Sequence, residues 1–576
     1  MDALLSQINA ILWHDYVLYI MVVTGLTFTV WSGFSQYRAL THGISVIRGR
    51  YDDPDDPGAI NHFQALSTAL SATVGLGNIG GVAIAIALGG PGAVFWMWVI
   101  GFLGMATKFT EVTLSMLYRN TEDPDNPHGG PMYVVSKGLV WRFPRLGHVG
   151  SFLGGLFCVT CLIMAATGGN MFQSWNVGTI TEAYFGVPSI ASGIILAVIV
   201  GMVIIGGIKR IGAVTGRLVP IMVSLYLIAA IYVLIINFAA IPDMFALIFK
   251  GAFSTLDASG AFIGGTMGYA FLFGMKRAIF SNEAGQGTSP IAHSAAKTKE
   301  PVREGIVAGL EPFLDTIVVC TLTALVILST GVWQRGAEAV LIDEPHFRQS
   351  LEGEWTLNTT RITERHSEQF VGGESVFLVV HSDPNPRSNN KMHRLEGYVV
   401  VARNGDVMVE WNTLATKAAP EVYDQGIYVS YVGATLTAKA FDTIVPGLGK
   451  WLITLTVWLF AISTMIAYSY YGEQAMVYLA GDKSIIPYKV VYCALAVVAT
   501  AGFLQTDAQL DNLTGLGTGV MLFVNVPIMW LFGAQAMRAY KDYVTRLKDG
   551  RMGPGHEPPT LEDLISGRDV EPNPDD

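Results

Sequence analysis

The stretch best suited to ligand chemistry is Ser67–Ala87, an apolar segment interrupted by Gly75, Gly77, Gly80 and Gly81. It is long and apolar enough to cross a bilayer as a helix. A spanning helix must satisfy its own backbone polar groups, because the hydrocarbon offers no water. A glycine-rich opening is therefore tolerated only where the freed N–H and C=O groups face a ligand or an ion. We expect a broken membrane helix that forms a binding site.

The same glycines fit two other patterns. Gly75-x-Gly77-x-x-Gly80 matches the dinucleotide fingerprint, which needs a preceding strand, a following soluble helix and an acidic residue about 20 positions later. The first carboxylate after the segment is Glu111, and the chain before it is apolar, so dinucleotide binding is disfavoured. The spacing Gly77-x-x-x-Gly81 also suits a close helix-packing seam, and that alternative stays open for the second half of the segment.

The composition places the chain among membrane proteins. Of 576 residues, 51% are hydrophobic and 14% are charged, which is typical of a polytopic membrane protein embedded in the lipid bilayer. The four cysteines lie in apolar stretches without a histidine cluster, so they are expected to pack rather than bind a metal. We expect no nucleic-acid partner, and no nucleophile–base constellation indicates an enzyme. The first 36 residues lack lysine and arginine, so no cleavable signal peptide is expected.

The pattern of hydrophobicity predicts eleven spans. Their approximate ranges are 16–31, 67–87, 93–117, 149–185, 189–208, 212–238, 259–280, 306–332, 449–480, 485–505 and 513–537. If the N-terminus is outside, nearly all lysines and arginines of the short loops face the cytoplasm, which is the expected bias. The sequence therefore predicts a multi-pass protein of the cell inner (plasma) membrane, with the N-terminus outside and the C-terminus cytoplasmic.

One long segment between the spans is polar. It contains the strand-like runs Ser375–His381, Gly397–Val401 and Asp406–Trp411, with the hairpin signal Asn404-Gly405 between the last two. By parity of the spans it is extracytoplasmic. We expect four regions: a membrane core over 1–332, a small β-rich insertion over 333–443, the last three spans over 444–540, and a cytoplasmic polar tail over 541–576.

Several motifs together resemble the alanine or glycine:cation symporter (AGCS) family. The matching stretches are Ala69–Ala83, Gly129–Tyr133, Gly169–Gln173, Phe280–Gly287, Leu314–Thr316, Ser463–Thr464 and Tyr470–Glu473. The resemblance runs from about residue 17 to 540, without the insertion. It implies an all-α, leucine-transporter-like fold, with two five-helix inverted repeats after one extra N-terminal helix. Such a repeat requires a second broken helix five spans after the first, and the stretch 259–280 is rich in glycine there.

The resemblance also implies a function. We expect sodium-coupled symport of a small neutral amino acid, alanine or glycine, into the cell by alternating access. An amino-acid carboxylate needs N–H donors, which half-helix N-termini and an amide supply, and its ammonium needs acceptors such as carbonyls and a glutamine oxygen. The expected substrate-binding residues are Thr73, Gly75, Gly77, Asn78, Gln173, Gly264, Gly265 and Tyr468.

Two of these residues have further readings. Gln173 also suits an interhelical hydrogen bond. Tyr468 stands where the family commonly has tryptophan, at a position that walls the side-chain pocket. A bulky wall leaves room for a methyl group and resists a branched side chain.

Sodium requires hard oxygen ligands, and the fold implied by the resemblance places a sodium site between the first broken helix and a later span. The expected ligands are the carbonyls near Ser71 and Val74 and the hydroxyls of Ser463 and Thr464. Back-bonding of the last two hydroxyls to their own helix remains an alternative. No cofactor is expected beyond sodium as a co-transported ion, and the oligomeric state stays open.

Charges inside the spans point to two rival functions. Lys108 and Glu111 share a helical face and are expected to pair. Glu311 and Asp315 lie four residues apart and either line the inward exit path or stabilise the fold. One rival function is a proton-coupled amino-acid carrier in which Glu311 or Asp315 titrates. The other is a channel or sensor on a transporter fold, whose outside domain binds a ligand.

Overall fold

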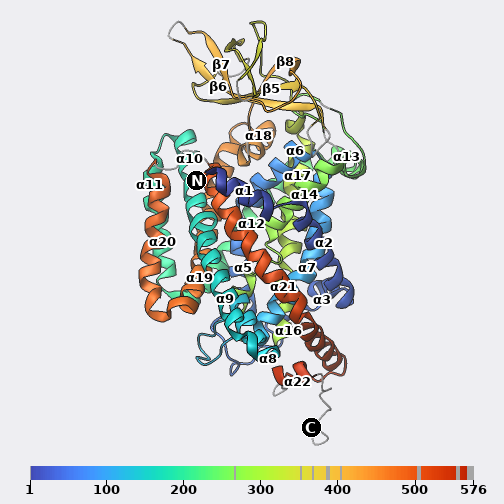
Figure 1. Ribbon diagram of the computed structural model, residues 1–576, viewed down its shortest axis with the longest axis vertical. Coiled ribbons are helices and arrows are strands. Elements are labelled where there is room, and N and C mark those ends of the chain that lie inside the picture. Colours follow the sequence, from blue (N-terminus) through green and yellow to red (C-terminus); the bar gives the residue numbers. More distant parts are fainter. Residues whose placement is uncertain are drawn as a thin grey trace, which may run out of the picture.

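A helical bundle carries a β-sheet unit at one end, and the C-terminal helix α22 (Leu561–Ser566) lies at the opposite end (Figure 1). We call these the insertion end and the C-terminal end of the molecule. The computed structural model describes residues 2–257, 259–264, 267–350, 353–365, 369–384, 390–402, 405–431, 433–502, 507–552 and 558–566.

The bundle is built from helices along almost the whole chain. In the first half these are α1 (Asp2–Leu12), α2 (Asp15–Trp31), α3 (Ser35–Thr41), α4 (Gly43–Ile47), α5 (His62–Thr73), α6 (Val82–Gly89), α7 (Gly92–Tyr118), α8 (Pro131–Arg142), α9 (Gly147–Ala166), α10 (Phe172–Phe185), α11 (Ser189–Ile204), α12 (Gly207–Ile236) and α13 (Ile241–Phe253). In the second half they are α14 (Met267–Asn282), α15 (Ser289–His293), α16 (Pro301–Ala308), α17 (Cys320–Ser329), α18 (Ala434–Ile444), α19 (Leu448–Ala480), α20 (Ile485–Thr500), α21 (Asp507–Lys548) and α22 (Leu561–Ser566).

Short turns of other helix types join several of these helices. The π turns are η1 (Gly77–Gly81), η3 (Thr167–Met171) and η5 (Phe313–Val319), and the 3₁₀ turns are η2 (Pro144–Leu146), η4 (Phe238–Ala240), η6 (Val332–Gln334) and η7 (Asp482–Ser484). π turns inside helices are frequent at functional sites. The turn η1 contains Gly77, Gly80 and Gly81, and the turn η3 contains Gly169.

The described residues contain eight helices that are long and apolar enough to cross a membrane. They are Gln7–Trp31, Gly92–Tyr118, Pro144–Phe185, Gly207–Ile236, Pro301–Ser329, Leu448–Ala480, Asp482–Thr500 and Leu513–Lys548. The bent pair His62–Thr73 and Gly77–Gly89 passes the same test as one broken span. The remaining two predicted stretches contain the shorter helices α11 and α14. The chain is therefore a polytopic membrane protein.

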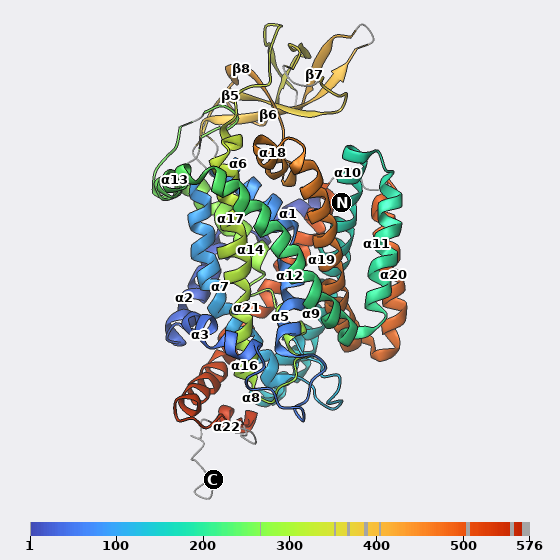
Figure 2. The ribbon, with the colours of Figure 1, turned by 180° about the vertical axis from the view of Figure 1, so that it is seen from behind.

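Burial distinguishes the central helices from the peripheral ones. In the most apolar windows of α7 and α19, 72% and 78% of the residues are buried, against 28% for the segment that contains α20. α11 and α20 pack side by side at the edge of the bundle (Figures 1 and 2). The centre of the molecule is therefore formed around α7 and α19.

The insertion forms an antiparallel sheet with strand order β1-β8-β5-β6-β7-β4 and a separate β2-β3 hairpin. The strands are β1 (Ala339–Val340), β2 (Phe347–Gln349), β3 (Trp355–Leu357), β4 (Thr360–Arg361), β5 (Ser375–His381), β6 (Met392–Val401), β7 (Val407–Trp411) and β8 (Glu421–Val429). β5 covers the first predicted run, β6 extends the second towards the N-terminus, and β7 begins one residue late. Of the predicted hairpin turn, Asn404 lies outside the described residues.

Two features tie the insertion to the bundle. The end of the predicted 333–443 segment is not part of the sheet: it is the helix α18, which packs against α19. In addition, the central strand β5 is buried on both faces. Val376, Leu378 and Val380 belong to the core of the sheet unit, while Phe377 and Val379 cluster with Ala261 and Ile263 of the bundle.

Candidate functional site

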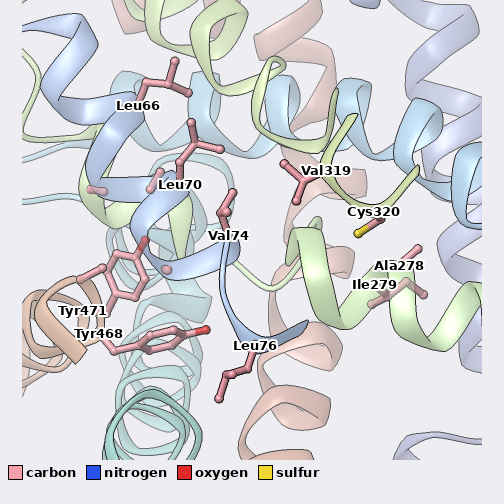
Figure 3. Packing of buried hydrophobic residues seen from close by; sticks show 14 of the residues in the cluster. Leu66, Leu70, Val74, Leu76, Ala278, Ile279, Val319, Cys320, Tyr468 and Tyr471 are labelled. Atoms are coloured by element: carbon pink, nitrogen blue, oxygen red, sulfur yellow. The ribbon is translucent and has the colours of Figure 1, made fainter. Parts of the chain in front are cut away.

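The predicted break in the first glycine-rich helix is present. α5 starts with a capping box formed by Asn61 and Gln64, and it ends at Val74, whose backbone is extended (φ −76°, ψ 97°). The chain then enters the π turn η1 and continues as α6, with a bend of 52° between the two halves. The Gly75 N–H donates to Asn78 Oδ1 at 2.7 Å, so one freed amide is satisfied within the turn. Figure 3 shows the chain leaving α5 at Val74 and passing Leu76.

A cavity of about 50 Å³ lies beside this break. Its wall combines the break with residues of the α9–η3–α10 span and of α14, α19 and α21. The lining residues are Ala72, Thr73, Gly75, Leu76, Gly77, Met164, Gly168, Phe172, Gln173, Phe280, Ser281, Glu283, Thr464, Tyr468 and Thr514. Five predicted substrate residues (Thr73, Gly75, Gly77, Gln173 and Tyr468) therefore come together at one cavity.

Two side chains of this cavity have buried oxygens available for a ligand. Within the described part of the chain, Thr73 Oγ1 and Gln173 Oε1 have no hydrogen-bond partner. The amide nitrogen of Gln173 donates to the Gly168 carbonyl at 3.0 Å, which fixes the orientation of the side chain. A buried polar atom without a partner costs free energy, about 1–3 kcal/mol for a typical group. A polar ligand in the cavity would recover that cost.

Sequence reasoning missed the carboxylate of the cavity, Glu283. It follows α14 directly, has a positive φ of 55°, and its side chain receives hydrogen bonds from the hydroxyls of Tyr468 and Thr288. Non-glycine residues with positive φ are uncommon and cluster at functional sites. The signal in the sequence is its place in Phe280–Gly287, one of the stretches that resemble the family.

Tyr468 forms one side of the cavity, as Figure 3 shows for its ring beside the break. Its ring rests on Gly169 of η3, where an added Cβ would lie 2.3 Å from the ring carbon Cγ. A second tyrosine, Tyr471, meets Tyr468 edge-on with ring centroids 5.2 Å apart. The ring is therefore held between a glycine and another aromatic side chain.

Three of the four predicted sodium ligands meet between α5 and α19. Ser71 Oγ donates to the Ser463 carbonyl at 2.7 Å, and Thr464 Oγ1 donates to the Ser71 carbonyl at 3.2 Å. The hydroxyls of Ser71 and Ser463 also contact each other. These contacts run between the helices, so back-bonding to their own helix does not account for Ser463 and Thr464. The fourth residue, Val74, is the residue at which α5 ends.

Asn78 lies outside the cavity lining. Its amide nitrogen donates to the carboxylate of Asp315 in η5 and, at 3.1 Å, to Ser281 Oγ. Ser281 and Thr316 also donate to Asp315, at 2.9 and 2.8 Å. Asn78 therefore links the broken helix to a fully buried carboxylate whose observed hydrogen bonds all come from neutral groups.

The second glycine-rich segment lies towards the insertion end. Gly264 has φ +84°, which favours glycine, and its carbonyl accepts a hydrogen bond from Asn390 of the insertion. Gly264 is not among the residues that line the cavity. Gly265 lies outside the described residues. α14 begins after this segment, at Met267.

Several buried ionisable side chains contact one another inside the bundle. Lys108 Nζ lies 3.8 Å from Glu111, which confirms the expected pair, and 3.3 Å from Glu311. His293 joins Glu311 to Glu304. Glu311 is therefore ion-paired with Lys108 and bonded to His293, whereas no described residue forms an ion pair with Asp315 on the same span.

The sequence of the chain matches a known protein family. A model of the sodium:alanine symporter family matches residues 1–363 and 413–557, which is most of the chain. The chain belongs to the sodium:alanine symporter family. The family resemblance of the motifs is thereby confirmed, and transport, symport and membrane location follow at the level of the family. Such proteins are secondary transporters rather than enzymes. Residues 364–412, which contain β5, β6 and β7, lie outside the match.

Individual relatives differ in the names they carry. The sodium/alanine symporter AgcS of Methanococcus maripaludis is 35% identical over 494 residues, covering 86% of this chain and 87% of the relative. YrbD of Bacillus subtilis is named as a candidate sodium/proton-dependent alanine carrier. It is 31% identical to this chain, over 96% of this chain and 95% of the length of YrbD. GlnT of the same organism is named as a probable sodium/glutamine symporter. It is 37% identical to this chain, over 56% of this chain and 65% of the length of GlnT.

Proposed function

We propose that this member of the sodium:alanine symporter family carries a small neutral amino acid, alanine or glycine, into the cell together with sodium. The observation that carries the proposal is the small cavity at the helix break, which is lined by backbone of Gly75 and Gly77 and by the carboxylate of Glu283. Such a cavity offers partners for both charges of an amino acid. The ring of Tyr468 in its wall leaves room for a methyl group and resists a branched side chain.

Each charge of the substrate has a candidate partner. The carboxylate would accept hydrogen bonds from backbone N–H groups after the break, where the positive end of the half-helix dipole lies. The ammonium would donate to Glu283 and to the Oε1 atom of Gln173, which has no partner within the described residues. Charge-assisted hydrogen bonds of this kind are about twice as strong as neutral ones.

Sodium would bind next to the substrate. The carbonyl oxygens of Ser71 and Val74 and the hydroxyls of Ser463 and Thr464 offer hard oxygen ligands from two helices. Thr464 also lines the cavity, so the ion and the substrate would share one wall. Binding of either would thereby favour binding of the other.

We further propose the architecture implied by the family resemblance for the alternating-access cycle. The bent pair α5–α6 would belong to the first five-helix repeat, and the glycine-rich segment before α14 would open the equivalent helix of the second repeat. In the proposed orientation the N-terminus and the insertion end face outside, and the C-terminus faces the cytoplasm.

Uptake by the purified protein in proteoliposomes tests the substrate class. We expect labelled alanine uptake in sodium buffer but not in potassium buffer, and unlabelled alanine and glycine should compete more strongly than leucine, glutamate or lysine. Glu283→Gln should reduce uptake strongly, whereas Glu182→Gln, an exposed glutamate on α10, should not. Uptake that is indifferent to sodium, or that leucine blocks best, would contradict the proposal.

Proton coupling is the second candidate function. The surroundings of the two buried acids favour Asp315 over Glu311 as the group that takes up the proton. A buried carboxylate that receives only neutral hydrogen bonds must take up a proton or attract a cation to avoid a large desolvation cost. If protons drive transport, Asp315→Asn should abolish uptake driven by a pH gradient. If sodium drives it, that variant should retain sodium-driven uptake.

A further inference from the structure

The part of the insertion outside the family match contacts the membrane bundle directly. The sheet lies across the insertion end, above α6, α14 and α17, in both views of the molecule (Figures 1 and 2). Contacts to the bundle come from Asn390, from Arg394 and Met392 of β6, from Phe377 and Val379 of β5, and from Tyr428 of β8. All of these except Tyr428 lie within 364–412, the stretch that the family model leaves unmatched.

The first contact is made to the end of α6. Arg394 Nη2 donates to the Ala87 carbonyl at 3.0 Å and to the Ala261 carbonyl at 3.2 Å. Ala87 lies in the last turn of α6, whose final carbonyls have no partner within the helix, and a cation there complements the helix dipole. The guanidinium also lies 4.4 Å from the centre of the Phe377 ring. One side chain thus bridges the end of α6 and the segment before α14.

The second contact is made to the segment that leads into α14. Asn390 Nδ2 donates to the carbonyls of Ile263 and Gly264 at 3.0 and 3.1 Å. Beside these bonds, Ala261 and Ile263 pack in an apolar cluster with Phe377, Val379 and Tyr428. Backbone carbonyls and apolar side chains of one short segment are thereby covered by the sheet. The segment is fixed by polar and apolar contacts at once.

The two contacted segments have a shared relation to the cavity. α6 follows the break at Gly75 and Gly77, which line the cavity, and its far end carries Ala87. α14 ends next to Glu283, which also lines the cavity, and the segment with Gly264 precedes its far end. The insertion therefore holds the outer ends of the two helices whose inner ends form the substrate cavity.

We propose that Arg394 and Asn390 are positioning residues that clamp the insertion-end halves of the two glycine-broken segments and so control the opening of the cavity towards that end. This inference rests on the proposed function only in that the cavity opens in a transport cycle. The clamp must release when the cavity opens, since separation of α6 from the segment before α14 breaks the bridge that Arg394 forms. The insertion is then part of the gate and not a passive appendage.

Accessibility of a cysteine in the cavity tests the clamp. In a chain without its four native cysteines, Leu76→Cys places a thiol in the cavity lining. A membrane-impermeant thiol reagent is applied to intact cells, and Tyr423→Cys, at an exposed site on β8, reports whether the insertion end faces the reagent. We expect Arg394→Ala combined with Asn390→Ala to raise the labelling rate of Leu76→Cys at least fivefold. Sodium with alanine should suppress the labelling.

Matched variants separate the clamp from a general effect on the insertion. Arg361→Ala removes another arginine of the same unit, which is exposed and pairs with Asp343, and it should leave the labelling rate unchanged. Arg394→Lys keeps a cationic donor and should restore most of the protection. The apparent KM for alanine should shift more than twofold in the double variant, while its amount in the membrane stays the same. Equal labelling in the double variant and in Arg361→Ala would overturn the proposal.

A crosslink provides a second measurement that does not depend on how well the alanine variants fold. Asn390→Cys and Ile263→Cys place two thiols at a site of direct contact. Oxidation should stop alanine uptake, and a reductant should restore it, because a locked clamp cannot release. Uptake that continues through a complete crosslink, or a crosslink that does not form, would contradict the clamp. If sodium and alanine fail to protect Leu76→Cys in the otherwise unaltered chain, the proposed function fails instead.

Discussion

Thr464 belongs to both halves of the candidate site, because it lines the cavity and its hydroxyl donates to the Ser71 carbonyl. Replacing it by valine keeps the side-chain shape and removes one hard oxygen. We expect Thr464→Val to raise the sodium concentration for half-maximal alanine uptake about tenfold, equivalent to about 1.4 kcal/mol. The measurement is the sodium dependence of initial uptake rates.

The control for this variant lies on the same helix. Thr456 of α19 is also fully buried, but its hydroxyl donates to the Leu452 carbonyl of its own helix. Thr456→Val should therefore leave the sodium dependence unchanged. An unaltered sodium dependence in Thr464→Val would remove Thr464 from the proposed ion site.

We expect the ring of Tyr468 to limit the size of the substrate side chain that the cavity accepts. Tyr468→Ala should let the protein accept valine or leucine, because it opens space next to the substrate side chain. The same truncation at Tyr471, which meets the ring of Tyr468 edge-on and is not among the residues that line the cavity, should not broaden the substrate range. Competition of labelled alanine uptake by branched amino acids measures the effect. If Tyr468→Ala still ignores valine and leucine while it transports alanine, the wall of the pocket lies elsewhere.

Part of this site could be predicted from residue types. The rest depends on the side-chain orientations that the residues adopt in the fold. Ser71, Ser463 and Thr464 meet because hydroxyls on small side chains sit where two helices approach closely. Asn78 was expected to face the substrate, yet its amide bonds to Asp315, 237 positions away in the chain. Which way an amide turns depends on partners that only the tertiary fold brings near it. The assignment of Asn78 to the substrate remains a prediction.

At the scale of the elements, the close approach of η3 to α19 requires a glycine at position 169. A Cβ there would lie 2.3 to 2.7 Å from atoms of Tyr468, so Gly169→Ala must push the ring aside, towards the cavity. We expect uptake of alanine to fall at least tenfold, and uptake of glycine to fall less, because glycine needs no room for a methyl group. Initial rates for the two substrates at equal expression test this.

A glycine of the same span serves as the control. A Cβ at Gly155 on α9 would meet only Leu479 Cδ2, at an ordinary distance of 3.8 Å. Gly155→Ala should leave both uptake rates near those of the unaltered protein. Equal losses of alanine and glycine uptake in Gly169→Ala would indicate general damage to the helix packing and not a narrowed pocket.

The helix break could be predicted because its cause is local. Gly75 and Gly77 weaken the helix wherever they are placed, and the sequence around them is too apolar for a surface loop. The sequence placed Gly264 of the second glycine-rich segment among the substrate-binding residues. Gly264 instead binds the insertion through its carbonyl, a contact with residue 390 that no local pattern could indicate.

At the scale of the whole molecule, the insertion should be dispensable for folding of the bundle. The bundle has its own continuous hydrophobic core, and the cost of closing a loop changes slowly with its length. Deleting residues 337–415 should leave a membrane-inserted protein that still transports alanine, with a cavity more open to thiol reagents at the insertion end. Surface labelling and uptake at matched expression measure both properties.

Two outcomes of this deletion would correct the account. A well-inserted deletion variant without any transport would show that the insertion is required for transport itself and does not only restrain the opening of the cavity. Transport with an unchanged labelling rate would show that the clamp contributes nothing. The runs that form β5, β7 and the second half of β6 were predicted as strands, whereas their place over α6 and α14 depends on contacts between distant segments.

The central claim is that a sodium gradient drives a small neutral amino acid through the membrane. The most direct measurement is accumulation of labelled alanine in proteoliposomes with an inward sodium gradient, while an ionophore keeps the proton gradient at zero. We expect internal alanine to rise above the external concentration and to fall back when the sodium gradient collapses. Alanine that only equilibrates, or that accumulates only with a proton gradient, would contradict the central claim.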